Sequence, residues 1–181
     1  MSSELEFTPS QIRELLDELT RRLDDNGIHG EMRVIGGAAM ALRFPDDSGV
    51  RATRDIDAVY VPAPEVDVVI QEMTRDLSLE PGWINSAAAP WLRVAGRRAT
   101  GRGFATIIAT AHELAAMKLA AGREWDLTDL AIIARHLGLN DPEQLVDIAY
   151  EVYGEDSVEL SDGRDSYRIL AESVIPKKPG R

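Results

Sequence analysis

The sequence predicts an α+β protein in which an N-terminal α/β half is followed by a helical half. Strand-like and helical patterns alternate up to about residue 109, and every later segment has helical spacing. A length of 181 residues suits one core with a helical appendage and is short for two full domains. We therefore expect an α/β core over residues 1–109, a helical part packed on it over residues 110–175, and a disordered tail over residues 176–181.

The α/β half should begin with a helix, a strand and a second helix. Thr8 is an N-cap followed by a proline and a capping-box glutamine, and leucines then recur at helical spacing until Gly27 stops the helix. Residues 32–35 have a strand pattern, and residues 38–42 have strong helical propensity. This order predicts a strand, a glycine turn and a helix in succession.

A second strand, a third helix and two further strands complete this half. The second strand covers about residues 55–61, after a loop rich in proline, aspartate and glycine. The next helix should direct apolar side chains from Val66 to Leu77 toward the core. Two more strands are expected near residues 91–95 and 104–109.

The helical half is predicted from its start and stop signals. Thr110 opens the first helix through a capping box, and further helices begin near Asp126, Asp141 and Ser161. Glycines fall where the helix ends belong.

Composition excludes several classes of function. With no cysteine, disulfides, thiolate catalysis and zinc–thiolate sites are excluded. The N-terminus lacks the features of a signal peptide, and no apolar run reaches the ~20 residues that span a bilayer, so we expect a cytoplasmic protein without a membrane partner. A net charge of -11 opposes unspecific binding to phosphate backbones. Any contact with RNA must therefore be local, and four clustered arginines are the candidates: Arg93, Arg97, Arg98 and Arg102.

Asp55 and Asp57 are the candidate metal ligands. Residues two apart in a strand share a face, with Cα atoms ~7 Å apart, so both carboxylates should project together. Oxygen ligands of this kind suit Mg²⁺, which combines a few carboxylates with water and substrate phosphates. The alternative is an edge strand with two solvated aspartates. Aspartate is a poor strand former, so two of them opening an apolar strand indicate a specific role.

Gly36 and Gly37 are the candidate phosphate cradle. They lie between a strand and a helix, where backbone N–H groups can bind phosphate and the absent side chains permit close approach. The alternative is simple turn chemistry. The aspartate pair a short loop later favours the phosphate interpretation, because nucleotide transfer needs a phosphate cradle beside a metal platform.

These motifs resemble the signature of a known superfamily. The hydrophobic-Gly-Gly segment at residues 34–37 and the Asp-x-Asp segment at residues 53–59 are similar to those of the DNA polymerase beta nucleotidyltransferase superfamily. The AbiEii-like branch, which includes toxins of toxin–antitoxin pairs, is the most similar. Residues 83–85 and 117–130 resemble later elements of that branch, so the resemblance covers the chain to about residue 139. It implies a nucleotidyltransferase fold, with a mixed sheet and flanking helices.

The resemblance also implies roles for single residues. Asp55 and Asp57 would bind Mg²⁺ or Mn²⁺, and the glycine pair would hold the phosphates of an NTP. Lys118, together with Asp126 or Asp129, would help to bind or activate the nucleotide. Arg54, next to the aspartate pair, is a further nucleotide-binding candidate. One departure is that the superfamily places a third carboxylate on a later strand, whereas residues 104–109 contain none. Asp126 or Asp129 would substitute for it, or the site would bind nucleotide without efficient transfer.

The residues themselves leave alternatives open in the helical half. Lys118 lies near the core-facing side of its helix, where it either contacts phosphate or buries its stem and extends its amine to water. Asp126 and Asp129 stand one turn apart at a helix start, where a carboxylate also favours the positive end of the helix dipole.

The predicted function is the transfer of NMP from an NTP to an acceptor hydroxyl, with loss of pyrophosphate. The predicted catalytic residues are Asp55, Asp57, Lys118 and Asp126. By analogy the acceptor is an RNA or tRNA 3′ end, guided by Arg51, Arg54 and the arginine cluster, and the protein is a toxin with a cognate antitoxin. The main alternative is a non-catalytic, antitoxin-like binding module. Phosphatases of the haloacid-dehalogenase type and glycosyltransferases fit less well, because there the acids follow the apolar strand.

Overall fold

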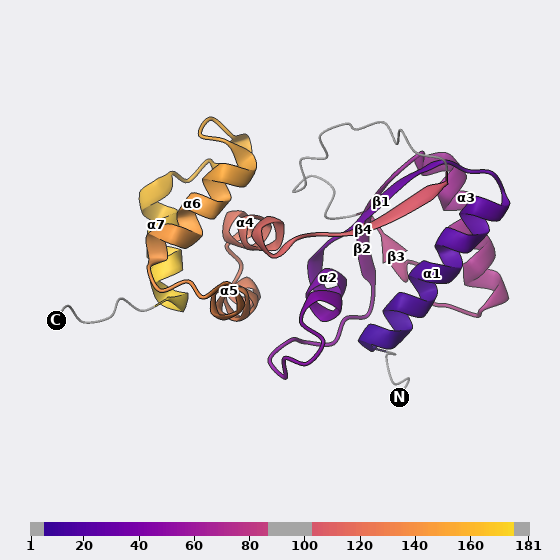
Figure 1. Cartoon of the computed structure of the whole chain (residues 1–181), viewed down its shortest axis with the longest axis horizontal. Helices are drawn as coiled ribbons and strands as arrows, with labels where there is room; N and C mark the ends of the chain where they lie inside the picture. The colour runs from indigo at the N-terminus through magenta and orange to yellow at the C-terminus, as the bar shows by residue number, and fades with distance from the viewer. Residues whose placement is uncertain (1–5, 87–102, 176–181) are drawn as a thin grey trace. The chain divides into compact units, whose positions relative to one another are not determined.

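The computed structural model describes residues 6–86 and 103–175, which belong to two compact units. The first unit comprises Met1–Pro45 and Arg51–Ala109, and the second comprises Asp46–Val50 and Thr110–Arg181. Within the described residues the chain forms seven α-helices and one mixed four-stranded sheet, so the fold class is α+β (Figure 1).

The sheet lies in the first unit and has the strand order β3-β2-β1-β4. Strand β1 pairs antiparallel with β2 and parallel with β4, while β2 pairs parallel with β3. The predicted mixed sheet is therefore confirmed, and the strand expected at residues 91–95 lies outside the described residues. The four strands are β1 (Gly30–Val34), β2 (Ile56–Val61), β3 (Ile84–Asn85) and β4 (Phe104–Ile108).

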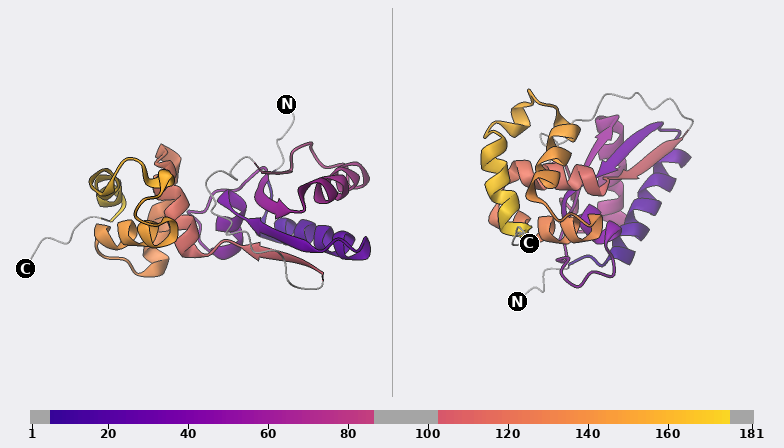
Figure 2. Two further views of the ribbon diagram at one scale, coloured as in Figure 1. Left: turned by 90° about the horizontal axis from the view of Figure 1, so that it is seen from above. Right: turned by 60° about the vertical axis from the view of Figure 1, so that its left-hand side comes forward.

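Three helices accompany the sheet: α1 (Pro9–Asp25), α2 (Gly36–Arg43) and α3 (Ala63–Asp76). The capping box predicted at Thr8 is present, and α1 and α3 pack against each other and against strands of the sheet (Figures 1 and 2). Alternate residues of β1 and β2 are buried in this layer, including Met32, Val34, Ile56 and Ala58. The core of the first unit therefore lies between the sheet and these helices.

Two local expectations for the first unit are wrong. Leu77 is 45% exposed and not in the core, because α3 ends at Asp76 and Leu77 is its C-cap. The glycine pair does not form a turn before the second helix. Gly36 and Gly37 are instead the first residues of α2, after Ile35 as N-cap.

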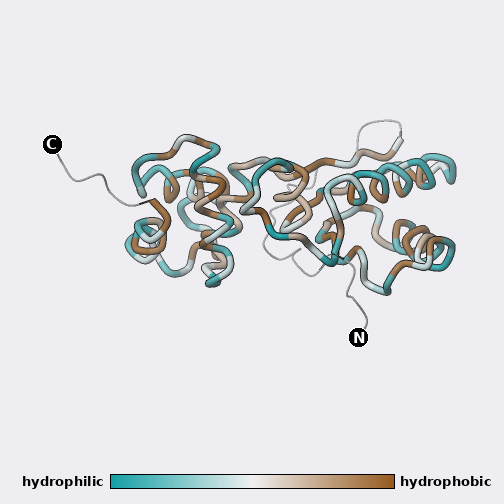
Figure 3. The backbone as a smooth tube through the Cα atoms, turned by 90° about the horizontal axis from the view of Figure 1, so that it is seen from below, coloured by the Kyte–Doolittle hydropathy of each residue, from teal (hydrophilic) through white to brown (hydrophobic). Residues whose placement is uncertain are grey.

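The second unit contains the remaining helices: α4 (Ala111–Ala121), α5 (Glu124–Leu137), α6 (Pro142–Tyr153) and α7 (Arg164–Val174). The central helix is α4, which contacts the other three and buries both leucines and alanines. The capping box at Thr110, the helix start at Asp141 and the C-caps at Gly138 and Gly154 are confirmed, and Asp141 also forms a capping box. The alternation of hydrophobic and hydrophilic residues along the helices is visible in Figure 3.

The last helix begins later than predicted. A short 3-10 helix, Val158–Leu160, precedes it, and α7 starts at Arg164 after Gly163 and not near Ser161. Among the described residues, no helix combines the length and apolar character needed to cross a membrane.

Trp83 anchors the beginning of β2 in the core of the first unit. The indole is 1% exposed, and its Nε1–H donates a 3.0 Å hydrogen bond to the hydroxyl of Thr74 on α3. That hydroxyl donates in turn to the carbonyl of Ile70 at 2.8 Å. The carbonyl of Trp83 accepts from the N–H of Ile56, the first residue of β2, at 2.8 Å. The position of β2 thus depends on a buried polar contact with α3.

We expect Thr74→Val to lower the free energy of unfolding by about 1–3 kcal/mol, because it leaves the buried indole N–H without an acceptor. Thr74→Ser is the matched control, since it keeps the hydroxyl. Urea unfolding followed by circular dichroism measures both variants. Equal losses for valine and serine would show that the methyl group, and not the hydrogen bond, matters at this position.

Candidate metal and phosphate site

The two aspartates stand where β2 begins. The strand starts at Ile56, one residue later than expected, so Asp55 immediately precedes it and Asp57 is its second residue. Ile56 and Ala58 are buried beneath the helices, whereas Asp57 is half-buried. Because side chains alternate along a strand, Asp57 lies on the sheet face opposite to the buried one.

Asp55 is held by two neighbours. The side-chain amide of Asn85 donates a 2.7 Å hydrogen bond to its Oδ2. The hydroxyl of Thr53 donates to its backbone carbonyl at 2.9 Å and approaches its Oδ1 at 3.5 Å. Thr53 is itself fixed, because its carbonyl accepts from the N–H of Phe7 at 2.7 Å. The Asp55 carboxylate therefore has a defined orientation before any ligand binds.

Asp57 lies against Gly36 at the start of α2. The N–H of Ile35 donates to the carbonyl of Asp57 at 2.9 Å, which ties the two segments together. A Cβ added to Gly36 would stand 2.5 Å from Oδ2 of Asp57, and the φ of Gly36 is +62°. Both the backbone conformation and the space beside the carboxylate thus require glycine at this position.

Gly37 has a similar but looser relation to Thr53. A Cβ at Gly37 would lie 3.1 Å from the Thr53 hydroxyl, which is tight without being prohibitive. Asp57 thus lies beside Gly36, and the next residue, Gly37, lies beside Thr53. Thr53 in turn is hydrogen-bonded to Asp55. The structure brings the glycine pair and the aspartate pair together in one place.

Three residues at this place were not singled out as site residues from the sequence. Thr53 and Asn85 orient Asp55, and Asn85 is also the register partner of Asp57 between β2 and β3. Arg33 pairs with Val59 across β1 and β2, which makes it the diagonal neighbour of Asp57 on the same face. The sequence contains only weak signals for these three residues. Thr53 stands two residues before Asp55, Asn85 follows two apolar residues, and Arg33 alternates with apolar residues in its strand.

The donor set suits a hard divalent cation. Asp55 and Asp57 supply carboxylate oxygens, the ligand type that Mg²⁺ and Mn²⁺ prefer. Among residues 6–86 and 103–175, no group of three or more histidine, cysteine, aspartate or glutamate side chains gathers at a spacing suited to a metal ion. Protein ligands here would number two carboxylates, which agrees with the usual Mg²⁺ pattern of few carboxylates completed by water and phosphate.

No family model, curated protein or solved structure matched the chain. The resemblance to nucleotidyltransferases therefore remains a prediction that depends on the residues quoted for it. What the structure adds is the local geometry of those residues.

In the second unit, Lys118, Asp126 and Asp129 form a buried cluster. The Lys118 ammonium lies 2.9 Å from Oδ1 of Asp126 and 2.5 Å from Oδ2 of Asp129. The lysine side chain is 13% exposed, and those of the aspartates are 4% and 5% exposed. The amine is thus held by two carboxylates and does not extend to water. Oδ2 of Asp126 is buried without a hydrogen-bond partner, so only one oxygen of this carboxyl group is engaged by the lysine.

The arginines predicted to contact RNA or nucleotide fall into two groups, one within and one outside the described residues. Arg51 and Arg54 are exposed in the segment that leads to Asp55. The cluster from Arg93 to Arg102 lies outside the described residues. Arg123, the N-cap of α5, has its guanidinium 5.9 Å from the centre of the Trp125 ring.

The first prediction from this site compares Gly36→Ala with Gly27→Ala. Both glycines have similar positive φ values, +62° and +67°, but nothing lies within 4 Å of a Cβ at Gly27. Each alanine should cost about 1–2 kcal/mol through its backbone conformation. Gly36→Ala should lose more and should alone weaken Mg²⁺ binding, measured by calorimetric titration, because it displaces the Asp57 carboxylate. Equal stability and equal Mg²⁺ binding in both variants would contradict the assigned contact.

The second prediction concerns the buried cluster. Lys118→Met should lower the free energy of unfolding by about 3–5 kcal/mol, because it leaves two buried carboxylates without a cation. Adding Asp126→Asn should restore part of the loss by removing one of those charges. Chemical denaturation measures both. A loss of less than about 1 kcal/mol would be typical of an exposed ion pair and would contradict the burial of the cluster.

Proposed function

We propose that the chain is a magnesium-dependent nucleotidyltransferase whose metal site is built on Asp55 and Asp57. The observation that carries the proposal is the contact of the Asp57 carboxylate with Gly36, at the N-terminus of α2. It puts the carboxylate that we propose as a metal ligand beside backbone N–H groups of a helix start. Nucleotide transfer requires that combination, because the same phosphates must be held and have their charge neutralised.

The start of α2 supports a phosphate role. Its N-cap is Ile35, which supplies no side-chain cap, and its first turn contains no acidic residue of its own. The N–H groups at a helix N-terminus carry partial positive charge and favour an anion. With glycine at both first positions, a phosphate oxygen can approach the backbone closely. Arg33, on the same sheet face as Asp57, adds positive charge.

Each residue has a defined task in the proposed reaction. Asp55 and Asp57 would hold the cation, and Asn85 and Thr53 keep Asp55 oriented toward it. A bound Mg²⁺ supplies Lewis-acid stabilisation of charge on the phosphate oxygens. In the transfer, an acceptor oxygen forms a bond to the α-phosphorus, the bond from the α-phosphorus to the bridging oxygen breaks, pyrophosphate leaves, and the acceptor proton passes to solvent.

The acceptor class belongs to the proposal as well. We infer an RNA 3′ hydroxyl, with tRNA as the first candidate, approached by the exposed Arg51 and Arg54 just before Asp55. A toxin role in the cytoplasm, neutralised by a cognate antitoxin, follows from the AbiEii-like resemblance. Because the net charge is -11, we expect RNA to be contacted at a small basic region and not over the whole protein surface.

The proposal does not depend on Lys118 touching phosphate. Its ammonium already has two carboxylate partners within the second unit, so its charge is compensated there. A phosphate contact would require at least one of those ion pairs to open. We therefore assign Lys118, Asp126 and Asp129 first to holding α4 and α5 together.

A second candidate is a non-catalytic module that binds nucleotide or a partner protein. The number of carboxylates at the site favours this candidate. Within residues 6–86 and 103–175, no third carboxylate joins the aspartate pair in a group suited to a metal ion. The two candidates differ in turnover and not in Mg²⁺ binding. Product formation therefore separates them.

The test is labelling of total RNA with each of four α-phosphate-labelled NTPs and Mg²⁺. Asp57→Asn should reduce labelling at least about a hundredfold, since it removes a charge that holds the cation. Asp17→Asn is the matched control, because Asp17 is an exposed aspartate on α1. Equal labelling by wild type and Asp57→Asn would refute the metal assignment. Mg²⁺-dependent binding of NTP in a thermal-shift scan without labelling would favour the binding module.

A further inference from the structure

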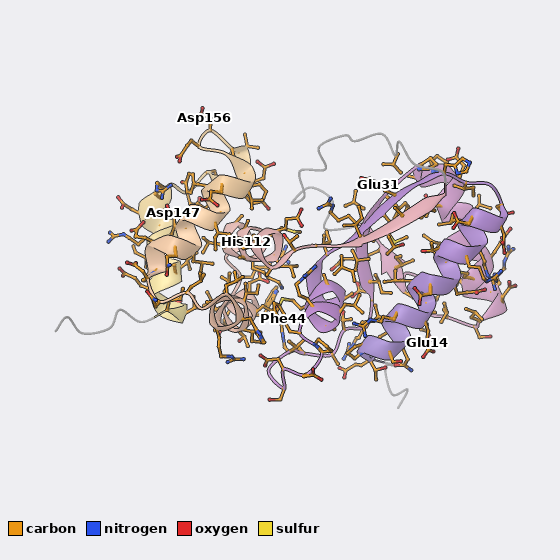
Figure 4. The ribbon with its side chains drawn as sticks, in the orientation of Figure 1. Glu14, Glu31, Phe44, His112, Asp147 and Asp156 are labelled. Carbon is orange, nitrogen blue, oxygen red and sulfur yellow. The ribbon has the colours of Figure 1, made fainter. Side chains whose placement is uncertain are left out.

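Residues 46–50 have an unusual place in the chain. They connect α2 to β2, the two elements of the first unit that carry the glycine pair and the aspartate pair. By their contacts, however, Asp46–Val50 belong to the second unit. The segment follows directly after Phe44, which is 7% exposed at the end of α2 (Figure 4), and Pro45. A short connection between two site elements is therefore part of the helical unit.

Asp47 is the centre of this attachment. Its Oδ2 lies 2.5 Å from Nη2 of Arg135 and 2.8 Å from Nε2 of His136, both in the last turn of α5. Its Oδ1 accepts the N–H of Gly49 at 3.0 Å, and its carbonyl accepts the N–H of Val50 at 3.0 Å. One carboxylate thus closes a turn within the segment and binds the segment to a helix. Its side chain is 10% exposed.

Packing supports the same attachment. A Cβ added to Gly49 would lie 3.2 Å from Cδ1 of Ile132, one turn before Arg135 on α5. Ile132 is 3% exposed, so the backbone of the segment covers an apolar side chain. The absence of a side chain at residue 49 permits this approach.

The charge of Asp47 is stable across the neutral pH range. Arg135, the N–H of Gly49 and His136 together lower the pKa of Asp47 to about 2, from an ordinary value of 3.8. A carboxyl whose pKa is lower in the folded state stabilises that state above the unfolded pKa. The contribution of Asp47 is therefore complete above about pH 4 and is lost as the pH falls through about 2. At neutral pH the attachment is fully formed.

We propose that residues 46–50 act as a strap in which Asp47 is a positioning residue for the aspartate pair. By binding the α2–β2 connection to α5, the strap restrains the C-terminal end of α2 and the residues that lead to Asp55 at the start of β2. The consequence for metal affinity rests on the proposed function, whereas the restraint itself does not. Asp47 touches neither the metal nor the substrate in this proposal.

The test uses Asp47→Asn in the full chain, with Asp46→Asn as the matched control. Asp46 is the neighbouring, exposed aspartate, so both changes remove one negative charge from the same segment. Amide hydrogen exchange should become about tenfold or more faster at Gly49 and Val50 in Asp47→Asn, because the segment loses its ion pair with Arg135 and the turn at residues 47–50 then opens more often. It should also rise in the last turn of α2 and at the start of β2. Asp46→Asn should leave all these rates unchanged.

Two further arms identify the contact and the site effect. Arg135→Gln should reproduce the Asp47→Asn pattern, and the double variant should be no worse than either single variant, because both remove one interaction. Titration with Mg²⁺ alone should show a severalfold lower affinity in Asp47→Asn only.

The outcomes separate the strap from the proposed function. Unchanged exchange at residues 46–50 overturns the strap, and faster exchange confined to those residues overturns the positioning role. If the wild-type chain binds no Mg²⁺, the proposed metal site fails, while the exchange rates of α2 and β2 still decide whether the strap positions them.

Discussion

The contact between Gly36 and Asp57 is the constraint on which the candidate site depends. Any side chain at residue 36 would collide with the carboxylate at 2.5 Å, and the positive φ would strain it as well. Because Gly36 opens α2 and Asp57 lies in β2, this one missing Cβ sets how closely the helix start and the strand approach. A bulkier residue would separate the acid pair from the helix N-terminus, so the proposed metal ligands would no longer lie beside its backbone N–H groups.

Hydrogen bonds from neighbouring residues orient Asp55 and the first residue of β2 beside that contact. Asn85 and Thr53 orient Asp55, and the buried Trp83 supplies the carbonyl that receives the first N–H of β2. In the second unit the equivalent organising feature is the cluster of Lys118 with Asp126 and Asp129, where burial makes the ion pairs costly to break. Each unit thus contains a polar interior feature that fixes its secondary structure elements, and the strap at Asp47 joins the α2–β2 connection to α5.

Local signals predicted most of the elements, and their failures have physical reasons. Capping boxes at Thr8, Thr110 and Asp141 involve residues three apart, so they are legible without tertiary structure. Leu77 had the right spacing for the core, but α3 ends just before it, and helix ends are decided by competing contacts. The glycine pair was expected in a turn before the second helix, whereas α2 begins at Gly36, where the positive φ and the nearby Asp57 carboxylate leave no room for a side chain.

The sequence by itself determined the α+β class, the order of the elements apart from β3, and the candidate pairs Gly36–Gly37 and Asp55–Asp57. These depend on periodicity, capping and spacing over a few residues. Only the tertiary structure decided which partners each side chain has: Asn85 lies 30 positions from Asp55, and Arg135 lies 88 positions from Asp47. Such contacts leave no local pattern, because they arise when packing brings distant segments together. For the same reason the sequence did not show that Lys118 pairs with two carboxylates in a buried cluster; the packing of α4 against α5 brings them together.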